Sequence, residues 1–178
     1  MGIANDTHVS IFLADFANAD PTGKVNAIGA GWQMVTMTPE TGATAPHAVV
    51  VLISAAPSVE DTEVNTTLTL CDASGEVVQI PGPAGDPQAL QVVQSVRLDR
   101  PTVQQFPQRE KLWSQGKVII NLPTGLPLQV DHEYQWVFKI EGVSGPQWMA
   151  PFFVVQPSEL REQDQPSGTA EVDPTTGP

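Results

Sequence analysis

The stretch Glu133-Tyr134-Gln135-Trp136-Val137-Phe138-Lys139-Ile140 decides the fold class of this chain. Its largest apolar side chains fall at every second position, starting with the tyrosine. A period of two is the pattern of a strand with one buried face, because successive side chains of a strand point to opposite sides. The stretch therefore predicts a half-buried strand with an aromatic inner face.

The same alternation recurs along the chain. It appears at residues 9–13, in Val64–Cys71 with Val64, Thr66, Leu68 and Leu70 as the inner set, in Gln91–Leu98 and in Lys117–Leu122. Val49–Ile53 and Phe152–Val155 are unbroken apolar runs, and their length favours central strands covered on both faces. We count eight or nine strands between His8 and Gln156.

Turn-forming residues separate these runs. Asp20-Pro21-Thr22-Gly23 and Ala73-Ser74-Gly75 predict tight turns, and Pro81–Pro87 predicts a loop outside any ladder. The only stretch with helical character, 104–113, is interrupted by Pro107. Many short strands without intervening helices predict an all-β, antiparallel, immunoglobulin-like β-sandwich over residues 1–157.

Composition restricts the classes of partner. The 178 residues carry 8 Lys and Arg against 20 Asp and Glu, a net charge of −12. Such an acidic chain lacks the basic surface that binds nucleic acid or anionic lipid. No apolar run reaches the length of a membrane helix, and the first residues do not resemble a signal peptide. We expect a protein made in the cytoplasm that binds neither membrane nor nucleic acid.

Residues 158–178 differ from the rest of the chain. Their charged residues are Glu159, Arg161, Glu162, Asp164, Glu171 and Asp173, a net charge of −4. Leu160 and Val172 are the only large aliphatic residues, and there is no aromatic one. This composition predicts a disordered or extended tail, which a neighbouring subunit would hold.

Candidate chemistry is sparse. Asp15, Asn18 and Asp20 supply oxygens in a short segment, so they are a weak calcium candidate, although an Asx-rich turn explains them better. His8, His47 and His132 fall in separate segments, and Cys71 lacks a neighbouring base, which favours an inert thiol. We expect no enzymatic activity, no cofactor and no metal site beyond that candidate.

A basic segment is the best candidate for partner binding. Arg97, Arg100, Arg109 and Lys111 are half of all cationic residues and lie in or beside 100–113. Trp and Arg are favoured at the centre of protein interfaces. The candidate partner-binding residues are Arg100, Phe106, Arg109, Lys111, Trp113, Leu160 and Val172. A loop tryptophan folded back onto its own sheet is the alternative for Trp113.

Two motifs stand out, one near the start of the chain and one in its last third. The first runs from Leu13-Ala14-Asp15-Phe16-Ala17-Asn18 to Gly23-Lys24-Val25-Asn26-Ala27-Ile28-Gly29. The second combines Leu126-Pro127-Leu128 with Glu133-Tyr134-Gln135-Trp136. Together they resemble a functionally uncharacterised β-sandwich family of bacteria and phages. The resemblance implies an immunoglobulin-like fold and a virion role, and it supplies no catalytic residues. Independently of it, Tyr134 has the spacing of a tyrosine corner, with a plain buried tyrosine as the alternative.

These features favour a non-enzymatic structural or binding protein. We expect a phage virion accessory protein, a capsid decoration or minor structural protein, localised to the virion. Its partners would be other virion proteins, either the major capsid protein or its own copies in a homo-oligomer. The alternative is a carbohydrate-binding β-sandwich, which would need an exposed, coplanar pair of aromatic side chains.

Overall fold

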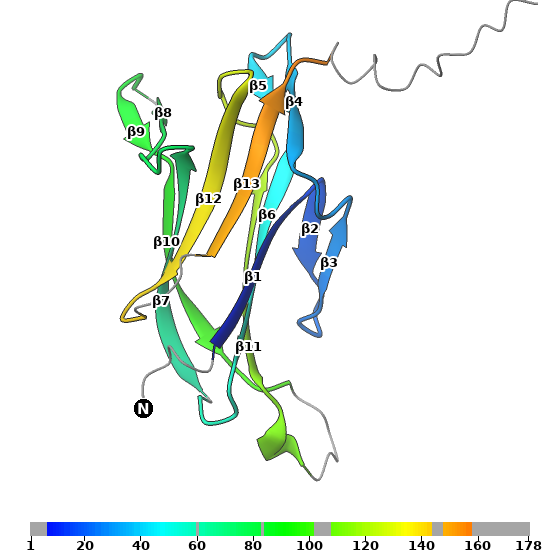
Figure 1. Ribbon diagram of the computed structural model, residues 1–178. Coiled ribbons are helices and arrows are strands. Elements are labelled where there is room, and N and C mark those ends of the chain that lie inside the picture. Colours follow the sequence, from blue (N-terminus) through cyan, green and yellow to red (C-terminus); the bar gives the residue numbers. More distant parts are fainter. Residues whose placement is uncertain (1–6, 60, 83, 102–107, 144–147, 158–178) are drawn as a thin grey trace, which may run out of the picture.

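The structure is a computed structural model that describes residues 7–59, 61–82, 84–101, 108–143 and 148–157. Nearly all of the regular secondary structure in this part is β-strand (Figure 1). It forms two facing sheets and two short hairpins. The expectation of an all-β chain is confirmed. Phe106, Leu160 and Val172 lie outside the described residues, as does the predicted tail.

The smaller sheet has the order β1-β6-β11. Its strands are β1 (Thr7–Ala14), β6 (His47–Ala55) and β11 (Ser114–Leu122). The central strand β6 is covered on both faces, as its apolar run predicts. Val49, Val51 and Ile53 face the main core, whereas Val50 packs beneath the hairpin of β2 (Phe16–Ala19) and β3 (Val25–Ile28).

The larger sheet has the order β10-β7-β12-β13-β4-β5. Its strands are β10 (Gln91–Leu98), β7 (Thr62–Asp72), β12 (His132–Ile140), β13 (Trp148–Val155), β4 (Met34–Thr38) and β5 (Ala43–Thr44). The inner residues predicted for β7 and β12 are all buried. The pairing is antiparallel except between β13 and β4, which are parallel. That pair corrects the expectation of purely antiparallel sheets.

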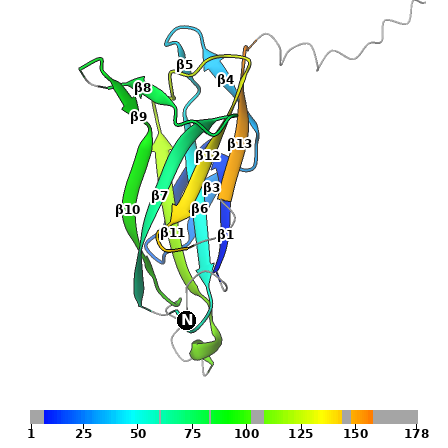
Figure 2. The ribbon, with the colours of Figure 1, turned by 60° about the vertical axis from the view of Figure 1, so that its left-hand side comes forward.

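The two sheets approach each other closely at one edge. A bridge between Asp99, just after β10, and Gln115 of β11 links them. Gly116 allows this approach, because a Cβ atom there would lie 2.6 Å from a Leu98 methyl group and 2.7 Å from one of Val96. The sheets therefore curl into a half-barrel around one core (Figure 2).

Two expectations about single segments were wrong. Phe152–Val155 is not covered on both faces: Phe152 and Val154 are buried, but Phe153 is 46% exposed on the outer face of β13. Pro81 and Pro87 do join a ladder, as the last pair between β8 (Gln79–Pro81) and β9 (Pro87–Ala89). A proline is tolerated at the end of such a ribbon, where its missing N–H is not needed.

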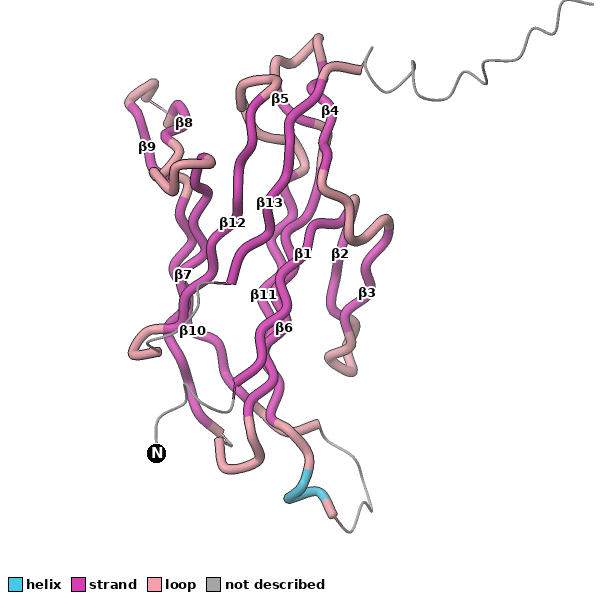
Figure 3. The backbone as a smooth tube through the Cα atoms, in the orientation of Figure 1, coloured by secondary structure: helices cyan, strands magenta, loops and turns pink. Residues whose placement is uncertain are grey.

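Helical structure is confined to one turn in the described part of the chain. The 3-10 helix η2 (Arg109–Lys111) follows Pro107 at the end of the molecule opposite β5 (Figure 3). In the same described ranges, no helix has the length and apolar character to cross a membrane.

Candidate protein-binding surfaces

Residues 108–113 form a pole at one end of the molecule, which we call the η2 pole. Trp113 immediately precedes β11 and is 39% exposed. Its ring stacks on His8 of β1, with ring centroids 5.3 Å apart and planes inclined by 30°. The tryptophan is therefore neither buried in the core nor detached: one strand holds it at the surface.

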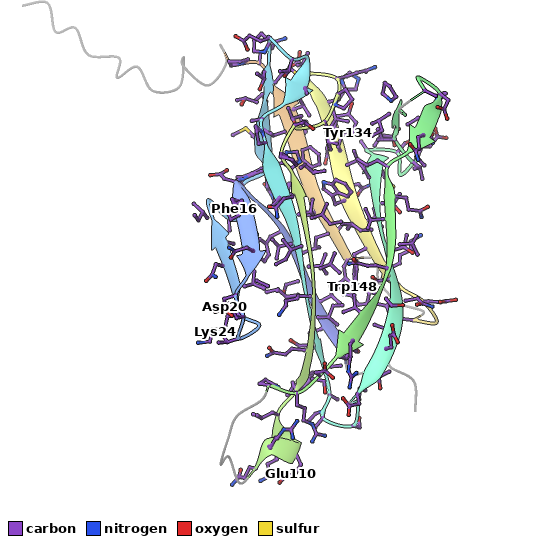
Figure 4. All side chains as sticks on the ribbon, turned by 180° about the vertical axis from the view of Figure 1, so that it is seen from behind. Phe16, Asp20, Lys24, Glu110, Tyr134 and Trp148 are labelled. Atoms are coloured by element: carbon purple, nitrogen blue, oxygen red, sulfur yellow. The ribbon has the colours of Figure 1, made fainter. Side chains whose placement is uncertain are left out.

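Two cationic residues precede this tryptophan on the pole. Arg109 and Lys111 are exposed, and Lys111 Nζ donates a hydrogen bond to Gln108 Oε1 at 3.3 Å. Glu110 lies between them at the tip of the molecule (Figure 4). Of the candidate partner-binding residues in the described part, this pole brings together Arg109, Lys111 and Trp113.

Arg97 and Arg100 are held by contacts within the fold. Arg97 forms salt bridges of 2.9 Å with Asp61 and Asp99. Hydrogen bonding to these carboxylates raises the pKa of Arg97, and Arg97 in turn lowers the pKa of Asp61. Arg100 donates a hydrogen bond to the Pro57 carbonyl. The Arg100 guanidinium therefore anchors the loop before β7. Binding of a partner by Arg100 remains a prediction.

The calcium candidate residues do not converge. Asp15 and Asp20 stand at opposite ends of the extended strand β2, and Asn18 bonds to Asn26 across the hairpin. Asp20 Oδ1 instead accepts hydrogen bonds from Thr22 N, Thr22 Oγ1 and Lys24 N at 2.7–2.9 Å. These bonds, led by that of the Thr22 hydroxyl, lower the pKa of Asp20. The geometry is that of an Asx turn.

The buried titratable groups are spread through the fold. Burial raises the pKa of the Cys71 thiol, which keeps it protonated at neutral pH. His47 is buried at the start of β6, whereas His8 is the second residue of β1 and His132 the first of β12. Among the residues that the structure describes, no cluster of three His, Cys, Asp or Glu side chains is placed to hold a metal ion.

Tyr134 forms a tyrosine corner. Its buried phenol oxygen accepts a hydrogen bond from the backbone N–H of Gln129 at 3.1 Å. This contact ties the loop before β12 to the strand, and it places Leu126 and Leu128 in the core. The spacing argument from the sequence is confirmed, and the corner explains the second motif as a structural element.

A groove that the sequence did not indicate lies beside the β2–β3 hairpin. It has a volume of about 1160 Å³ and is lined by the tip of that hairpin, by Leu52, Ile53 and Ser54 of β6, by the start of β11 and by the end of β10. Its charged lining residues are Lys24, Arg97, Asp99, Arg100 and Lys117. We call it the β10–β11 groove. The lysines were missed because they lie far apart in the sequence, in segments without a basic run.

Exposed apolar pairs were also missed. Phe16 faces outward from β2 and pairs across the hairpin with Ile28, which is 67% exposed (Figure 4). Met34 pairs with Phe153 between β4 and β13, and both are exposed. The sequence offered one signal for the exposure of Phe16. Alternation places Ala17 on the inner face of β2, so its neighbour Phe16 falls on the outer face.

The fold and these surfaces define a small all-β protein of two curled, facing sheets with apolar and basic features on its outside. The chain belongs to a family of unknown function (DUF6941), which matches residues 9–154. The match begins within β1 and ends within β13, so it covers all or most of each strand that the structure describes. A comparison with curated proteins gave no match.

Proposed function

We propose that this protein is a non-enzymatic binding module that acts through protein–protein contacts as a phage virion accessory protein. The η2 pole is the observation that carries the proposal. There, a half-exposed Trp113 is fixed on His8 beside the cationic Arg109 and Lys111. An immobilised aromatic ring among cations loses little conformational entropy on binding, which is typical of interface hot spots.

The charge of the chain supports this choice of surface. The pole is basic on a chain of net charge −12, so it attracts an acidic partner while the rest of the surface repels one. The finer parts of the proposal are an immunoglobulin-like arrangement of the strands and a place in the virion as a capsid decoration or minor structural protein. These rest on the resemblance of the two motifs.

The experiment is to count copies of the chain in purified virions by quantitative mass spectrometry. Virions are produced from the genome that encodes the chain, with either the wild-type allele or Arg109→Ala/Lys111→Ala/Trp113→Ala. We expect the wild type in the particles and at least a tenfold loss for the triple variant, with its melting temperature preserved, because the substituted residues lie outside the core.

The control is Val93→Ala/Lys139→Ala, which removes one exposed apolar group and one cation elsewhere. It should leave the copy number unchanged. Particles that lack the wild-type chain would show that the virion proposal is wrong. Equal copy numbers for wild type and triple variant would show that the η2 pole is not the binding surface.

Carbohydrate binding is the competing proposal, and it would use the same tryptophan. Sugars stack on open aromatic faces, but one face of Trp113 lies against His8, and Trp136 is fully buried. The geometry therefore favours a protein partner. Glycan binding that is lost in Trp113→Ala and retained in Arg109→Ala/Lys111→Ala would reverse this preference.

A further inference from the structure

The β10–β11 groove concentrates positive charge on an acidic protein. Four of its five charged lining residues are cationic, so the lining carries a net charge of +3, while the whole chain carries −12. These four are half of all cationic residues in the sequence. A concave, basic surface on such a chain favours an acidic ligand.

Two lysines supply the charge that a ligand would meet. Arg97 is already balanced by Asp61 and Asp99, and Arg100 is bonded to Pro57 O. Lys117 donates one hydrogen bond, to Gly23 O, and its ammonium group has two further N–H donors. Lys24 follows that glycine in the chain and stands at the tip of the β2–β3 hairpin (Figure 4).

Two of the strands that line the groove, β10 and β11, are edge strands of their sheets. In the described chain, β10 pairs with β7 and β11 pairs with β6, and β10 and β11 are joined by the bridge between Asp99 and Gln115, beside which Gly116 packs against Val96 and Leu98. Each of the two is the edge strand of its sheet, and beyond the bridge its outer side carries no further strand in the described residues. An extended peptide is the ligand that such edges bind.

We propose that the groove binds the acidic C-terminal segment, residues 158–178, of a second copy of this chain. That segment carries five acidic residues and one arginine. Its charge is opposite to that of the groove, and its 21 residues span up to about 70 Å when extended. The groove thus receives the segment that the sequence predicts to be held by a neighbour.

The strand register favours a second copy over the same molecule. Near its end, β13 pairs through Val154 with His132 at the start of β12. At this same start of β12, Tyr134 pairs with Asp72, the last residue of β7. The groove lies at the other end of β7, where Arg97 pairs with Glu63. The segment leaves one end of the molecule and its binding groove lies toward the other, so copies join head to tail in a heterologous contact.

Sedimentation velocity of full-length chains across a concentration series tests this inference. The groove variant is Lys24→Glu/Lys117→Glu. The tail variant replaces Glu159, Glu162, Asp164, Glu171 and Asp173 by Lys. We expect the wild type to self-associate, more weakly at high salt, and each variant to associate at least tenfold more weakly.

Mixing the two variants restores association, because the acidic tail of the groove variant meets the intact groove of the tail variant. Combining both sets of substitutions in one chain restores it as well. Lys139→Glu, a matched change on the exposed face of β12, should leave self-association unchanged. Circular dichroism and an unchanged melting temperature show that each variant is folded.

Three results would overturn the inference: a wild type that stays monomeric, a groove variant that associates like the wild type, or a mixture that stays as monomeric as its components. A tail bound to its own molecule gives the first of these results. The inference goes beyond the proposed function, and either of the two can be wrong while the other holds. Arg109→Ala/Lys111→Ala/Trp113→Ala should leave self-association intact.

Discussion

Thr44 of β5 and Leu126 hold the loop at Gly125 against β5 by two hydrogen bonds. Thr44 N donates to Leu126 O at 2.9 Å, and Leu126 N donates to Thr44 Oγ1 at 3.0 Å. Gly125 has a φ of +66°, and a Cβ atom there would lie 1.8 Å from the Thr44 carbonyl oxygen. The position therefore requires glycine both for its backbone conformation and for space.

We expect Gly125→Ala to be much more destabilising than Gly42→Ala. Gly42 has nearly the same φ, +62°, but open space around it, so alanine there costs only the left-handed conformation, about 1–2 kcal/mol. Gly125→Ala adds a clash with rigid backbone, a further loss of about 1–3 kcal/mol. Urea unfolding measures both, and equal losses would contradict the steric argument.

His47 is a buried, neutral histidine. Because a carbonyl can only accept, Nδ1 carries the proton that bonds Ala45 O at 2.9 Å. The ring lies 5.7 Å from that of Trp32 and 6.3 Å from that of Phe152, and Nε2 has no partner among the described residues. Burial in these surroundings lowers the pKa of His47 below 6.5.

This lowered pKa predicts a loss of stability in mild acid. Below pH 6.5 the unfolded chain binds a proton that folded His47 does not, so stability present at neutral pH falls as the pH drops toward the folded pKa. The slope reaches at most about 1.4 kcal/mol per pH unit. Urea unfolding between pH 7.5 and 5 should show this slope in the wild type and lose it in His47→Asn. The matched control His132→Asn, whose exposed ring also bonds the carbonyl two residues back, should retain it.

At the scale of the element, one turn design occurs twice. Asp72 Oδ1 accepts from Ser74 N, Ser74 Oγ and Glu76 N at 2.6–3.0 Å, as Asp20 does in the β2–β3 turn. The hydrogen bond from the Ser74 hydroxyl is the main cause of the lowered pKa of Asp72. Each aspartate organises its own turn, and this explains why the sequence predicted both turns correctly.

Asp72→Asn keeps the hydrogen-bond acceptor but removes the titration. The stabilisation from the ionised carboxylate is complete above the ordinary pKa of 3.8 and is lost as the pH falls through the lowered, folded value. The melting temperature of the wild type should therefore exceed that of Asp72→Asn above pH 3.8, and the difference should vanish in stronger acid. A difference that persists there would exclude the charge as its cause, and Glu110→Gln controls for loss of a surface charge.

Alternation predicted the elements best where one face of a strand meets the core and the other meets water. The inner positions of β7 and β12 are buried as it predicts, although Cys71 and Val137 are also buried at outer positions, and the predicted hydrogen bond of Tyr134 to upstream backbone is present. It failed for Phe152–Val155, because an apolar side chain such as Phe153 can lie outside when no charge marks that face. The parallel neighbour of β13 left no local signal at all, since β4 is more than a hundred residues away.

At the scale of the whole molecule, the candidate surfaces differ in how far the sequence could predict them. The η2 pole is a continuous segment, so Arg109, Lys111 and Trp113 stood out as a basic run with a tryptophan. The β10–β11 groove is assembled from a hairpin tip, an edge strand and a strand end. Lys24 and Lys117 are 93 positions apart in the numbering and meet only through Gly23.

Deleting residues 158–178 should leave the folded body intact. The buried core and the family match both end before Val155, and every described strand precedes the deleted segment. We expect a melting temperature within about 2 °C of the full chain, measured by differential scanning calorimetry at low concentration. A chain that fails to fold without the segment would place the domain boundary beyond residue 157.

The position of β13 has a consequence for how the protein is synthesised. This strand comes last among those described, yet it lies inside the larger sheet, between β12 and β4. While the ribosome is still making residues 148–155, β4 lacks its main neighbour and the aromatic core lacks Phe152. Until the final strand emerges from the ribosome, the apolar residues of the earlier strands that pack against it therefore stay exposed to solvent. Folding is completed after translation of the whole domain, and chaperones would meet the chain in that interval.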